Sequence, residues 1–401
     1  MTQRPRSDLR SRSVAIVLMI TVLGGGALLS CAQAPAAISA IESPSARPSP
    51  ANPARSTPPS ASTTPSASAS VSPSPSPIAA SYEDLSGIET TPELAHRYPI
   101  AVMIDDSPAA RQQAGLSFAS IVWQAPAEGG IPRYMAIFQS GTAPSIGPVR
   151  SARLYFVRWA AEWKAVYLHA GGPPPLRSFL AGRQKLVHDV NGRTARRVSF
   201  RAAPHNLYTD GKRIRRFAEE AKNATSERLG YDPTKPGRLQ PFADAASEAD
   251  RGPDGGTIRV AYTSAKVIYT YDRPSNTWLR SVDGRKQHDA LATRNGGHGK
   301  IGSGPRIAPT TVVVMVVPIR RSTAIEGAAL GRLEADSIGT NTAWVFANGR
   351  VTKGTWRKKD PSDRTRFLDA TGQEIVFPRG QIFIQVVPKA SAAKFTVEAA
   401  R

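Results

Sequence analysis

Apolar runs and charged residues lie closest together in residues 98–153 of the chain. This stretch contains YPIAVMIDD (98–106), IVWQAPAEGGIPRYMAIF (121–138) and IGPVRSAR (146–153). Apolar runs of this length, each followed by polar or turn-forming residues, predict strands at 100–104, 120–124 and 134–138. The paired glycines after Glu128 permit positive φ or a close backbone approach. We therefore expect charged side chains to be delivered to one edge or loop of a sheet.

A helix is predicted from Arg150 to Leu168, with Pro148 at its start. The positive end of a helix disfavours arginine in the first turn, so Arg150 and Arg153 need negative partners. The carboxylates considered as protein partners are Asp105, Asp106 and Glu128. Two interpretations stay open, a buried ion-pair network and an anion-binding or catalytic cleft.

The chain has 401 residues and a formal charge of +21. Its length favours two folded domains plus accessory segments, and its charge favours anionic partners. We expect no nucleic acid among them, because the N-terminus directs the chain out of the cytoplasm. A basic start is followed by sixteen uncharged residues, 14–29, which are too few to span a bilayer comfortably, so residues 1–30 predict a signal peptide.

Cys31 is the single cysteine of the chain and follows Leu28-Leu29-Ser30. This motif resembles a bacterial lipobox, in which the cysteine is diacylated and becomes the mature N-terminus. The alternative is an ordinary secreted protein cleaved near Ala32. With its one cysteine committed to lipid, the chain has no disulfide and no thiolate metal site. We expect localisation at the cell membrane, lipid-anchored on its extracytoplasmic face.

The remaining chain divides by composition. Residues 31–80 are mostly Ala, Ser, Pro and Thr, which cannot form a core, and predict a disordered tether after the lipidated cysteine. Residues 81–245 predict an N-terminal domain and residues 256–390 a second one, joined by a connection rich in Gly, Pro, Asp and Ala around 237–256. A proline-rich docking motif is the weaker interpretation of the tether.

Further polar residues gather in two loops of the first domain. His169 precedes a Gly-Gly turn, and the loop 203–210 contains His205, Asn206 and Asp210. A lone histidine is more often structural than functional, so both interpretations stay open for His169. Residues 212–228 predict a basic surface helix.

The second domain is predicted to be rich in strands. Alternating or continuous β-branched and aromatic runs with turn residues between them indicate strands at 258–263, 266–271, 277–282, 310–317, 342–347, 349–356, 365–368, 374–377 and 381–387. We expect these strands to be mostly antiparallel. Trp278, Trp344 and Trp356 are expected in the core rather than on a binding surface.

Several classes of site are missing from the sequence. There is no phosphate-binding P-loop, no GxSxG elbow, no HExxH and no paired-cysteine zinc motif. We therefore expect neither a metal nor a cofactor. A carboxylate pair such as Asp105 with Glu128 would suit glycoside hydrolysis, but the separation of the two groups is not given by the sequence.

Part of the chain resembles the N-terminal domain of the YerB-like family of bacterial lipoproteins. The resemblance rests on the motifs AVMIDD, WQAPAEGGIPRYMAIF, IGPVRSAR, LHAGG and APHNLYTD, in that order. The later motifs SVDGRKQHDA, GTWRK and LDATGQEIVFPRGQIFIQVVP resemble its smaller C-terminal domain. The resemblance covers roughly residues 85–388. It implies an α+β fold, with a mixed-sheet N-terminal domain carrying helices and a smaller, mostly antiparallel β-rich C-terminal domain. It implies little about activity, because the family is of unknown function.

Two positions depart from the family pattern. Asp106 stands where such proteins usually have Asn, and Pro173 stands where Ser usually follows His-Ala-Gly-Gly. These departures argue against a catalytic nucleophile at either position.

The preferred function is a non-enzymatic, membrane-tethered binding or accessory protein of the cell envelope. Its partners would be the membrane, through the lipid, and an anionic cell-wall polymer or an envelope protein, bound at a basic cleft. One alternative is a cell-wall polymer hydrolase or transferase with Glu128 or His169 as acid or base, and another is a docking partner for other envelope proteins. The candidate cleft residues are Asp105, Glu128, Arg133, Arg150, Arg153, His169, His205, Asn206 and Asp210.

Overall fold

The strands predicted at 98–138 form the middle of a long mixed sheet. They are β3 (Ile100–Asp105), β4 (Ile121–Pro126) and β5 (Pro132–Phe138), which pair antiparallel in the order β4-β5-β3. Asp105 pairs with Arg133 across β3 and β5, so their side chains start from the same end of the sheet. The predicted delivery of charged groups to one edge of a sheet is thus confirmed for these two residues.

The computed structural model describes residues 80–172, 187–220, 232–235, 239–292, 299–300, 304–322 and 331–400. The predicted signal peptide, Cys31 and the tether to residue 79 lie outside these residues. Among the described residues, no helix is long and apolar enough to cross a membrane.

Strands from both halves of the chain share the long sheet, whose order is β22-β21-β20-β17-β24-β4-β5-β3-β6-β7, with β26 paired to β21. The other strands of this sheet are β6 (Val166–His169), β7 (Val187–Asp189), β17 (Thr311–Val316), β20 (Gly339–Ala347), β21 (Arg350–Lys358), β22 (Arg366–Leu368), β24 (Ile382–Val387) and β26 (Glu398–Ala399). Parallel pairing of β24 with β4 joins the halves, and β24 also pairs parallel with β17. Sequence reasoning gave each half its own sheet, whereas the structure places both in one. The predicted domain boundaries stay a prediction.

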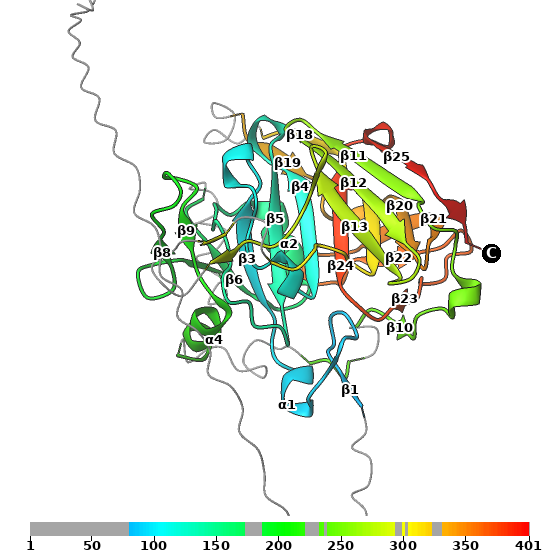
Figure 1. Ribbon diagram of the computed structural model, residues 1–401, viewed down its shortest axis with the longest axis horizontal. Helices are drawn as coiled ribbons and strands as arrows, with labels where there is room; N and C mark the ends of the chain where they lie inside the picture. The colour runs from blue at the N-terminus through cyan, green and yellow to red at the C-terminus, as the bar shows by residue number, and fades with distance from the viewer. Residues whose placement is uncertain are drawn as a thin grey trace, which may run out of the picture. The chain divides into compact units, whose positions relative to one another are not determined.

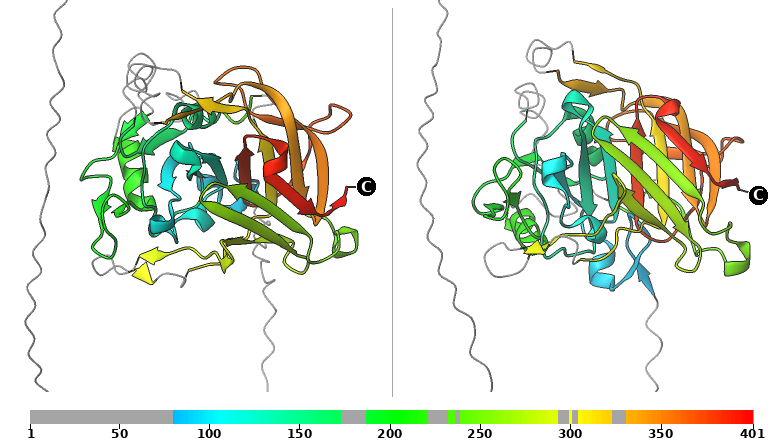
Figure 2. Two further views of the ribbon diagram at one scale, coloured as in Figure 1. Left: turned by 90° about the horizontal axis from the view of Figure 1, so that it is seen from above. Right: turned by 45° about the horizontal axis from the view of Figure 1, so that its top comes forward.

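A second sheet is antiparallel throughout and has the order β14-β13-β12-β11-β25. Its strands are β11 (Thr257–Tyr262), β12 (Ala265–Asp272), β13 (Thr277–Val282), β14 (Arg285–Lys286) and β25 (Ala393–Thr396). Figures 1 and 2 show β11, β12 and β13 lying over the orange and red strands of the long sheet. Ring contacts join the layers, among them Tyr269 with Phe383 at 6.4 Å and Trp278 with Phe346 at 5.9 Å.

Both faces of the long sheet are covered, which explains its almost continuous apolar strands. In β3, Ile100, Val102 and Ile104 belong to a core shared with the second sheet and α4 (Gly211–Glu220). The alternate residues Ala101 and Met103 belong to a core shared with α2 (Leu154–Ala161). This division follows from the two-residue period of a strand.

Helix α2 joins the sheet through aromatic and ionic contacts. Trp159 stacks on Trp123 of β4, with ring centroids 4.6 Å apart and planes inclined by 11°. At the C-terminal end of α2, Glu162 accepts a hydrogen bond from Lys358 Nζ at 3.0 Å, and both side chains are buried. Because Lys358 lies in β21, this buried ion pair connects residues about 200 positions apart in the chain.

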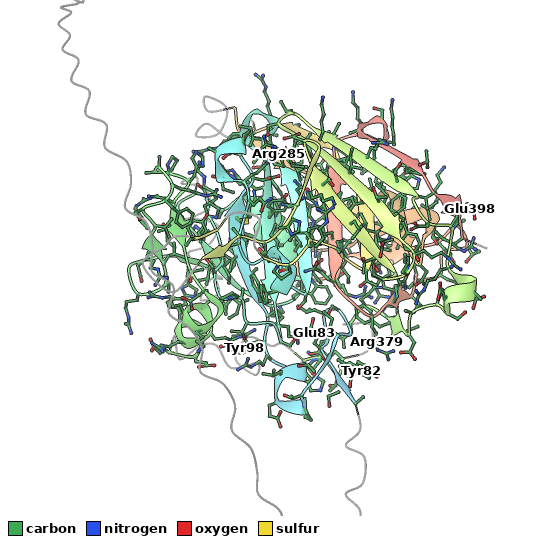
Figure 3. The ribbon with its side chains drawn as sticks, in the orientation of Figure 1. Tyr82, Glu83, Tyr98, Arg285, Arg379 and Glu398 are labelled. Carbon is green, nitrogen blue, oxygen red and sulfur yellow. The ribbon has the colours of Figure 1, made fainter. Side chains whose placement is uncertain are left out.

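The remaining described elements are short. The two-stranded pairs are β1 (Ser81–Tyr82) with β2 (Glu89–Thr90), β8 (Arg196–Arg197) with β9 (Leu207–Tyr208), β10 (Phe242–Ala243) with β23 (Phe377–Pro378), β15 (Leu291–Ala292) with β16 (Gly299–Lys300), and β18 (Ile319–Arg321) with β19 (Leu333–Ala335). The third described helix is α1 (Pro92–Ala95), and 3₁₀ turns occur at Pro108–Ala110, Leu116–Phe118, Glu128–Gly130, Glu248–Asp250 and Ala390–Ala392. Near the first strand, the Arg379 guanidinium lies 4.1 Å from the ring centroid of Tyr82 (Figure 3).

The predicted helix at 150–168 is wrong at both ends. Residues before Leu154 are extended, because Val149 N donates to Leu207 O at 2.6 Å and Arg150 N to Met103 O at 2.9 Å. These bonds to strand partners replace the bonds of a helix. After Ala161 the chain turns and forms β6, which pairs parallel to β3. Arg150 is therefore not in a first helical turn, and the argument from the helix dipole fails for it.

Other predictions agree with the structure more closely. Strands occupy each predicted site in the second half, although the one expected at 374–377 is reduced to β23, Phe377–Pro378. Trp278 and Trp356 are fully buried, and Trp344 packs at the edge of the core. Helix α4 begins where predicted, and its described part ends at Glu220. The connection expected around 237–256 contributes β10, which pairs with β23.

Candidate functional site

Five charged side chains meet where β3, β5 and the extended segment before α2 come together. We call Asp105, Glu128, Arg133, Arg150 and Arg153 the arginine cluster. Asp105 ends β3, Arg133 lies in β5, and Arg150 follows the bridge between Val149 and Ile104. Glu128 projects from the turn that joins β4 to β5. Backbone pairing thus brings residues far apart in the sequence to one end of the sheet.

Glu128 binds two arginines at once. Arg153 donates to both carboxylate oxygens, with Nε 2.5 Å from Oε1, and Arg133 Nη2 donates to Oε2 at 3.0 Å. Burial raises the pKa of the Glu128 carboxyl, but the hydrogen bond from Arg153 and the charge of Arg133 outweigh burial, so its pKa lies below the ordinary value. Glu128 is therefore a carboxylate of low basicity near neutral pH.

The glycines after Glu128 have the conformation that the sequence predicts. Gly129 has φ 63° and Gly130 has φ 74°. A Cβ on Gly130 would lie 2.2 Å from Thr263 Oγ1, in the turn between β11 and β12. The Glu128 turn therefore needs glycine both for its backbone and for its contact with the second sheet.

Asp105 is the second carboxylate of the cluster. Its Oδ2 accepts hydrogen bonds from Arg150 Nε at 2.8 Å and from His205 Nδ1 at 2.7 Å, while Oδ1 accepts from Ser107 N at 3.0 Å. Burial raises its pKa, but the Ser107 amide and the Arg150 charge prevail, so the pKa is lowered. Ser107 Oγ also lies 3.2 Å from His205 Nδ1.

His205 is oriented by this contact. A hydrogen bond to a carboxylate places the ring proton on Nδ1 and leaves Nε2 as an acceptor. Nε2 has no partner among the described residues, and about a fifth of the side chain is exposed. Through Asp105, the cluster thus contacts a histidine that is oriented to act as an acid or base.

Positive charge exceeds negative charge in the cluster, with three guanidinium groups against two carboxylates. Burial, followed by the neighbouring charge of Arg153, lowers the pKa of Arg133 to about 10, and Glu128 offsets this only in part. Arg150 uses Nε for Asp105, and its terminal amino groups have no partner in the described part of the chain. Its side chain is 25% exposed. The cluster therefore presents unpaired, positively charged hydrogen-bond donors of Arg150 to solvent.

His169 lies beside the cluster without touching its side chains in any contact of the described structure. It ends β6, and Ala170 N donates to Arg150 O at 2.9 Å. Its Nδ1 lies 2.8 Å from Gly171 O and 4.0 Å from Asp189. Burial lowers the pKa of the His169 imidazole, against the opposing effects of the Gly171 carbonyl and Asp189.

Asn206 and Asp210 have structural contacts instead. Asn206 Oδ1 accepts from Arg197 Nη1 at 2.7 Å, and its Nδ2 donates to Val198 O, which holds the β8–β9 hairpin. Asp210 Oδ1 accepts from Arg213 N at 2.9 Å and caps α4. An aspartate three residues before that amide is a recognisable N-cap pattern, so the sequence contained a signal for this role.

Sequence reasoning missed a second polar network directly behind the cluster. Asp106 accepts hydrogen bonds from Arg111 Nε at 3.1 Å, Gln113 Nε2 at 3.1 Å and Gln124 Nε2 at 2.6 Å. Arg280 Nη2 donates to Gln124 Oε1 at 2.7 Å and is itself fully buried. We call these residues the Arg280 network. An arginine in an alternating strand gives no sequence signal of such burial.

No group of three or more His, Cys, Asp or Glu residues in the described part of the chain could hold a metal ion. The arginine cluster is also unsuited to a cation, because guanidinium groups occupy both of its carboxylates. Its chemistry suits an anion, with forked donors matched to planar or tetrahedral oxyanions.

Comparison with known proteins identifies the family. The N-terminal domain described as "Protein of unknown function (DUF3048)" matches residues 85–225, and the C-terminal domain of the same description matches residues 258–384. "Putative lipoprotein YerB" of Bacillus subtilis (strain 168) is 30% identical over 319 residues, which cover 78% of this chain and 88% of the relative. The crystal structure of YerB protein from Bacillus subtilis matches with a TM-score of 0.64 and 26% identity, over 79% of this chain and 99% of that chain. The chain therefore belongs to the YerB-like family, whose two domains are described as of unknown function.

Proposed function

We propose that this protein is a lipid-anchored binding protein on the extracytoplasmic face of the cell membrane, and that its arginine cluster binds an anionic group of a cell-wall polymer. Three observations support the anchor: the basic leader, the Leu-Leu-Ser-Cys motif ending at Cys31, and a relative that is named a lipoprotein. The tether of residues 31–80 would allow the folded part to reach away from the bilayer.

The observation that carries the binding proposal is the free guanidinium edge of Arg150. Its Nε is held by Asp105, so the side chain is already ordered before a ligand arrives. Pre-ordering reduces the entropy lost on binding. The two terminal amino groups of Arg150 donate no hydrogen bond to any described residue. A phosphate or carboxylate oxygen could accept hydrogen bonds from them.

The charge around Arg150 favours the same ligand. Arg133 and Arg153 share one carboxylate, Glu128, and burial with mutual repulsion lowers the pKa of Arg133 to about 10. An external anion would compensate this surplus charge. A neutral or cationic ligand would leave it unrelieved.

Binding is tested with Arg150→Ala and a matched control. Arg357 of β21 is exposed and has no partner in the described structure, so Arg357→Ala removes the same charge elsewhere. Isothermal titration with purified teichoic acid should show affinity reduced roughly tenfold by Arg150→Ala and nearly unchanged by Arg357→Ala, because charge-assisted hydrogen bonds are lost only in the first. Equal affinity of the two variants would reject the arginine cluster as the binding site.

Salt provides a second measure of the same interaction. Attraction between partly exposed charges is screened over about 10 Å at 0.1 M ionic strength. Affinity for teichoic acid should therefore fall as sodium chloride is raised from low to physiological concentration. Binding that does not change with salt would contradict an electrostatic site.

The anchor is tested separately with Cys31→Ala. The wild type should carry labelled fatty acid and sediment with membranes, and the variant should be released in soluble form. Unchanged membrane association of the variant, with no label on the wild type, would contradict lipidation.

An acid–base function at the same cluster is the second candidate, and the Asp105–His205 contact of 2.7 Å favours it. His205 Nε2 is the available base, whereas Glu128 is held as a weak base by Arg153 and Arg133. Release of soluble fragments from a purified wall polymer by the wild type, lost in His205→Gln with the fold intact, would establish a hydrolase. No release by the wild type would leave binding as the function.

A further inference from the structure

Helix α4 carries basic residues that the arginine cluster does not use. The side of the helix facing the core holds Ile214, Arg215 and Ala218, all buried. Arg215 donates to the carbonyl oxygens of Tyr98 at 2.7 Å and of Gln139 at 2.6 Å, and its guanidinium lies 5.5 Å from the Tyr98 ring centroid. Figure 3 marks Tyr98 at this position beside α4. The helix is therefore firmly anchored, and its remaining basic residues face outward.

A cavity of about 470 Å³ lies against this outer side of α4. Its volume is in the range of small-molecule sites. The residues that line it are Arg193, Thr194, Asp210, Lys212, Arg213, Arg216, Phe217 and Glu220. Four of these are cationic and two are anionic, so the lining has a formal charge of +2.

Internal ion pairs account for half of the cations. Arg193 Nη2 lies 2.9 Å from Glu220 Oε2, and Arg213 Nε lies 3.1 Å from Asp210 Oδ2. Asp210 also accepts from Arg213 N, so the N-terminus of α4 is already capped and does not itself form the site. The surplus positive charge of the cavity lining comes from the two remaining cationic side chains, Lys212 and Arg216.

Lys212 and Arg216 are exposed and have no partner among the described residues. They are four positions apart on one helix, which brings their side chains to the same side. Like charges at this spacing repel one another weakly, and an anion bound between them would relieve that repulsion. Phe217 forms one wall of the cavity and is held edge-on by His188 of β7, with ring centroids 5.0 Å apart.

We propose that this cavity is a second anion site, distinct from the arginine cluster, and that it binds a phosphate group through Lys212 and Arg216. Arginine offers a planar fork and lysine a compact charge, a combination suited to the several oxygens of a phosphate. The phosphate can belong to a soluble polymer or to a lipid headgroup, and both sources present the same oxyanion. The proposal does not depend on ligand binding at Arg150.

The test uses the full chain with Cys31→Ser, so that no lipid anchor contributes to vesicle binding. The variant Lys212→Gln/Arg216→Gln removes the two unpaired charges of the cavity. Its matched control is Lys353→Gln/Arg357→Gln, which removes one lysine and one arginine, also exposed and four positions apart, from β21. Strand β21 is separated from β6 and β7 by most of the long sheet.

Titration with tripolyphosphate measures the soluble source, and sedimentation with vesicles containing phosphatidylglycerol measures the lipid source. We expect the cavity variant to weaken binding of at least one probe roughly tenfold, with the control within about twofold of the parent. Loss in the tripolyphosphate arm alone identifies a soluble phosphate ligand, and loss in the vesicle arm alone identifies a headgroup. No binding of either probe by the parent, or equal loss in cavity variant and control, would overturn the proposal.

Acylation of lysine side chains shows directly where on the protein the probe binds. Saturating tripolyphosphate or vesicles should protect Lys212 from an amine-acylating reagent and leave Lys353 reactive, as measured by mass spectrometry. Equal reactivity of Lys212 with and without both probes would contradict the site. Arg150→Ala separates the two proposals, because it should leave this protection intact even if it abolishes teichoic acid binding.

Discussion

Two adjacent aspartates, Asp105 and Asp106, are both buried and paired with arginine but belong to different polar networks. Asp105 joins the partly exposed arginine cluster, with Arg150 and His205 as partners. Asp106 joins the Arg280 network, in which its side chain is fully buried. Successive side chains at the end of a strand point to opposite sides of the sheet, and this alternation separates the two carboxylates.

The pKa values of the two carboxyl groups shift in opposite directions. Burial raises the pKa of Asp106, even against the charges of Arg111 and Arg280. For Asp105, burial acts in the same direction but is outweighed by the Ser107 amide and Arg150, so its pKa is lowered. The cluster therefore stabilises the ionised form of a buried carboxylate beside a partly exposed arginine, whereas burial in the Arg280 network opposes ionisation of Asp106.

One environment is a proposed binding site and the other is an internal connector. The Arg280 network joins β3 and β4 to the second sheet through Arg280 and Gln287, and Gln287 Nε2 donates to Gln113 Oε1 at 3.1 Å. Arg280 also lies over the rings of Tyr134 and Tyr269. The second environment connects the two sheets, whereas ligand binding at the first is the proposed function.

The largest effect is expected from Arg280→Met. It leaves Asp106 buried with less compensating charge, and removes donors to Gln124 and Tyr269. Breaking one side of a buried charged network costs about 3–5 kcal/mol, so urea denaturation should show a large loss of stability. The double variant Arg280→Met/Asp106→Asn should recover part of it, because the carboxylate is then removed as well. A loss below about 1 kcal/mol for Arg280→Met would contradict the assigned role.

A smaller effect is expected from Arg153→Ala, because Glu128 keeps Arg133 as a partner and is 26% exposed. Loss of hydrogen bonds to a charged group predicts destabilisation of about 2 kcal/mol.

Arg150→Ala should lower the free energy of unfolding by less than Arg153→Ala, because Asp105 retains His205 and Ser107 N. Thermal melts of both variants beside Arg357→Ala provide the measurement. If Arg150→Ala were as destabilising as Arg280→Met, the cluster would be an internal connector too, and the comparison would fail.

The smallest effect concerns His169, whose folded-state pKa lies below the ordinary 6.5 because of burial. The unfolded state then binds more protons below pH 6.5, so this contribution to stability is complete above that pH and is lost as pH falls towards the folded pKa. Between pH 7.5 and 5.5 the wild type should lose about 1 kcal/mol or less from this group. His169→Asn, which can still donate to Gly171 O, should show a weaker decline over the same range. An identical decline would assign the pH dependence to other groups.

Local pattern was sufficient for most of the strands. Runs such as VVVMVV at 312–317 and IFIQVV at 382–387 are apolar enough to be buried on both faces, and both became strands of the long sheet. Pattern failed at residues 146–153, where Pro148 and the following arginines suggested a helix start. There, hydrogen bonds to Met103 and Leu207 outweigh local preference.

Local pattern also predicted part of the arrangement of charged side chains at the candidate site. Asp105, Glu128, Arg133, Arg150 and Arg153 do come together, because the sequence places charged residues at the ends of neighbouring strands. Asn206 and Asp210 do not join them, since a loop residue can equally well cap or hold its own loop. The contacts of Ser107 with His205 and of Arg280 with Gln124 gave no signal, because the two residues of each pair are remote in the chain.

The sequence by itself determined the features that depend on short-range chemistry. Apolar runs specified where strands form, Gly129 and Gly130 specified a turn with positive φ, and the residue order of the motifs specified the family. Tertiary structure decided the features that depend on distant partners: the parallel pairing of β4 with β24, and the contact of Asp105 with Arg150 and His205. The physical reason is that a hydrogen bond or ion pair between residues about 260 positions apart is stabilised by the packed core around it, which no local window of sequence contains.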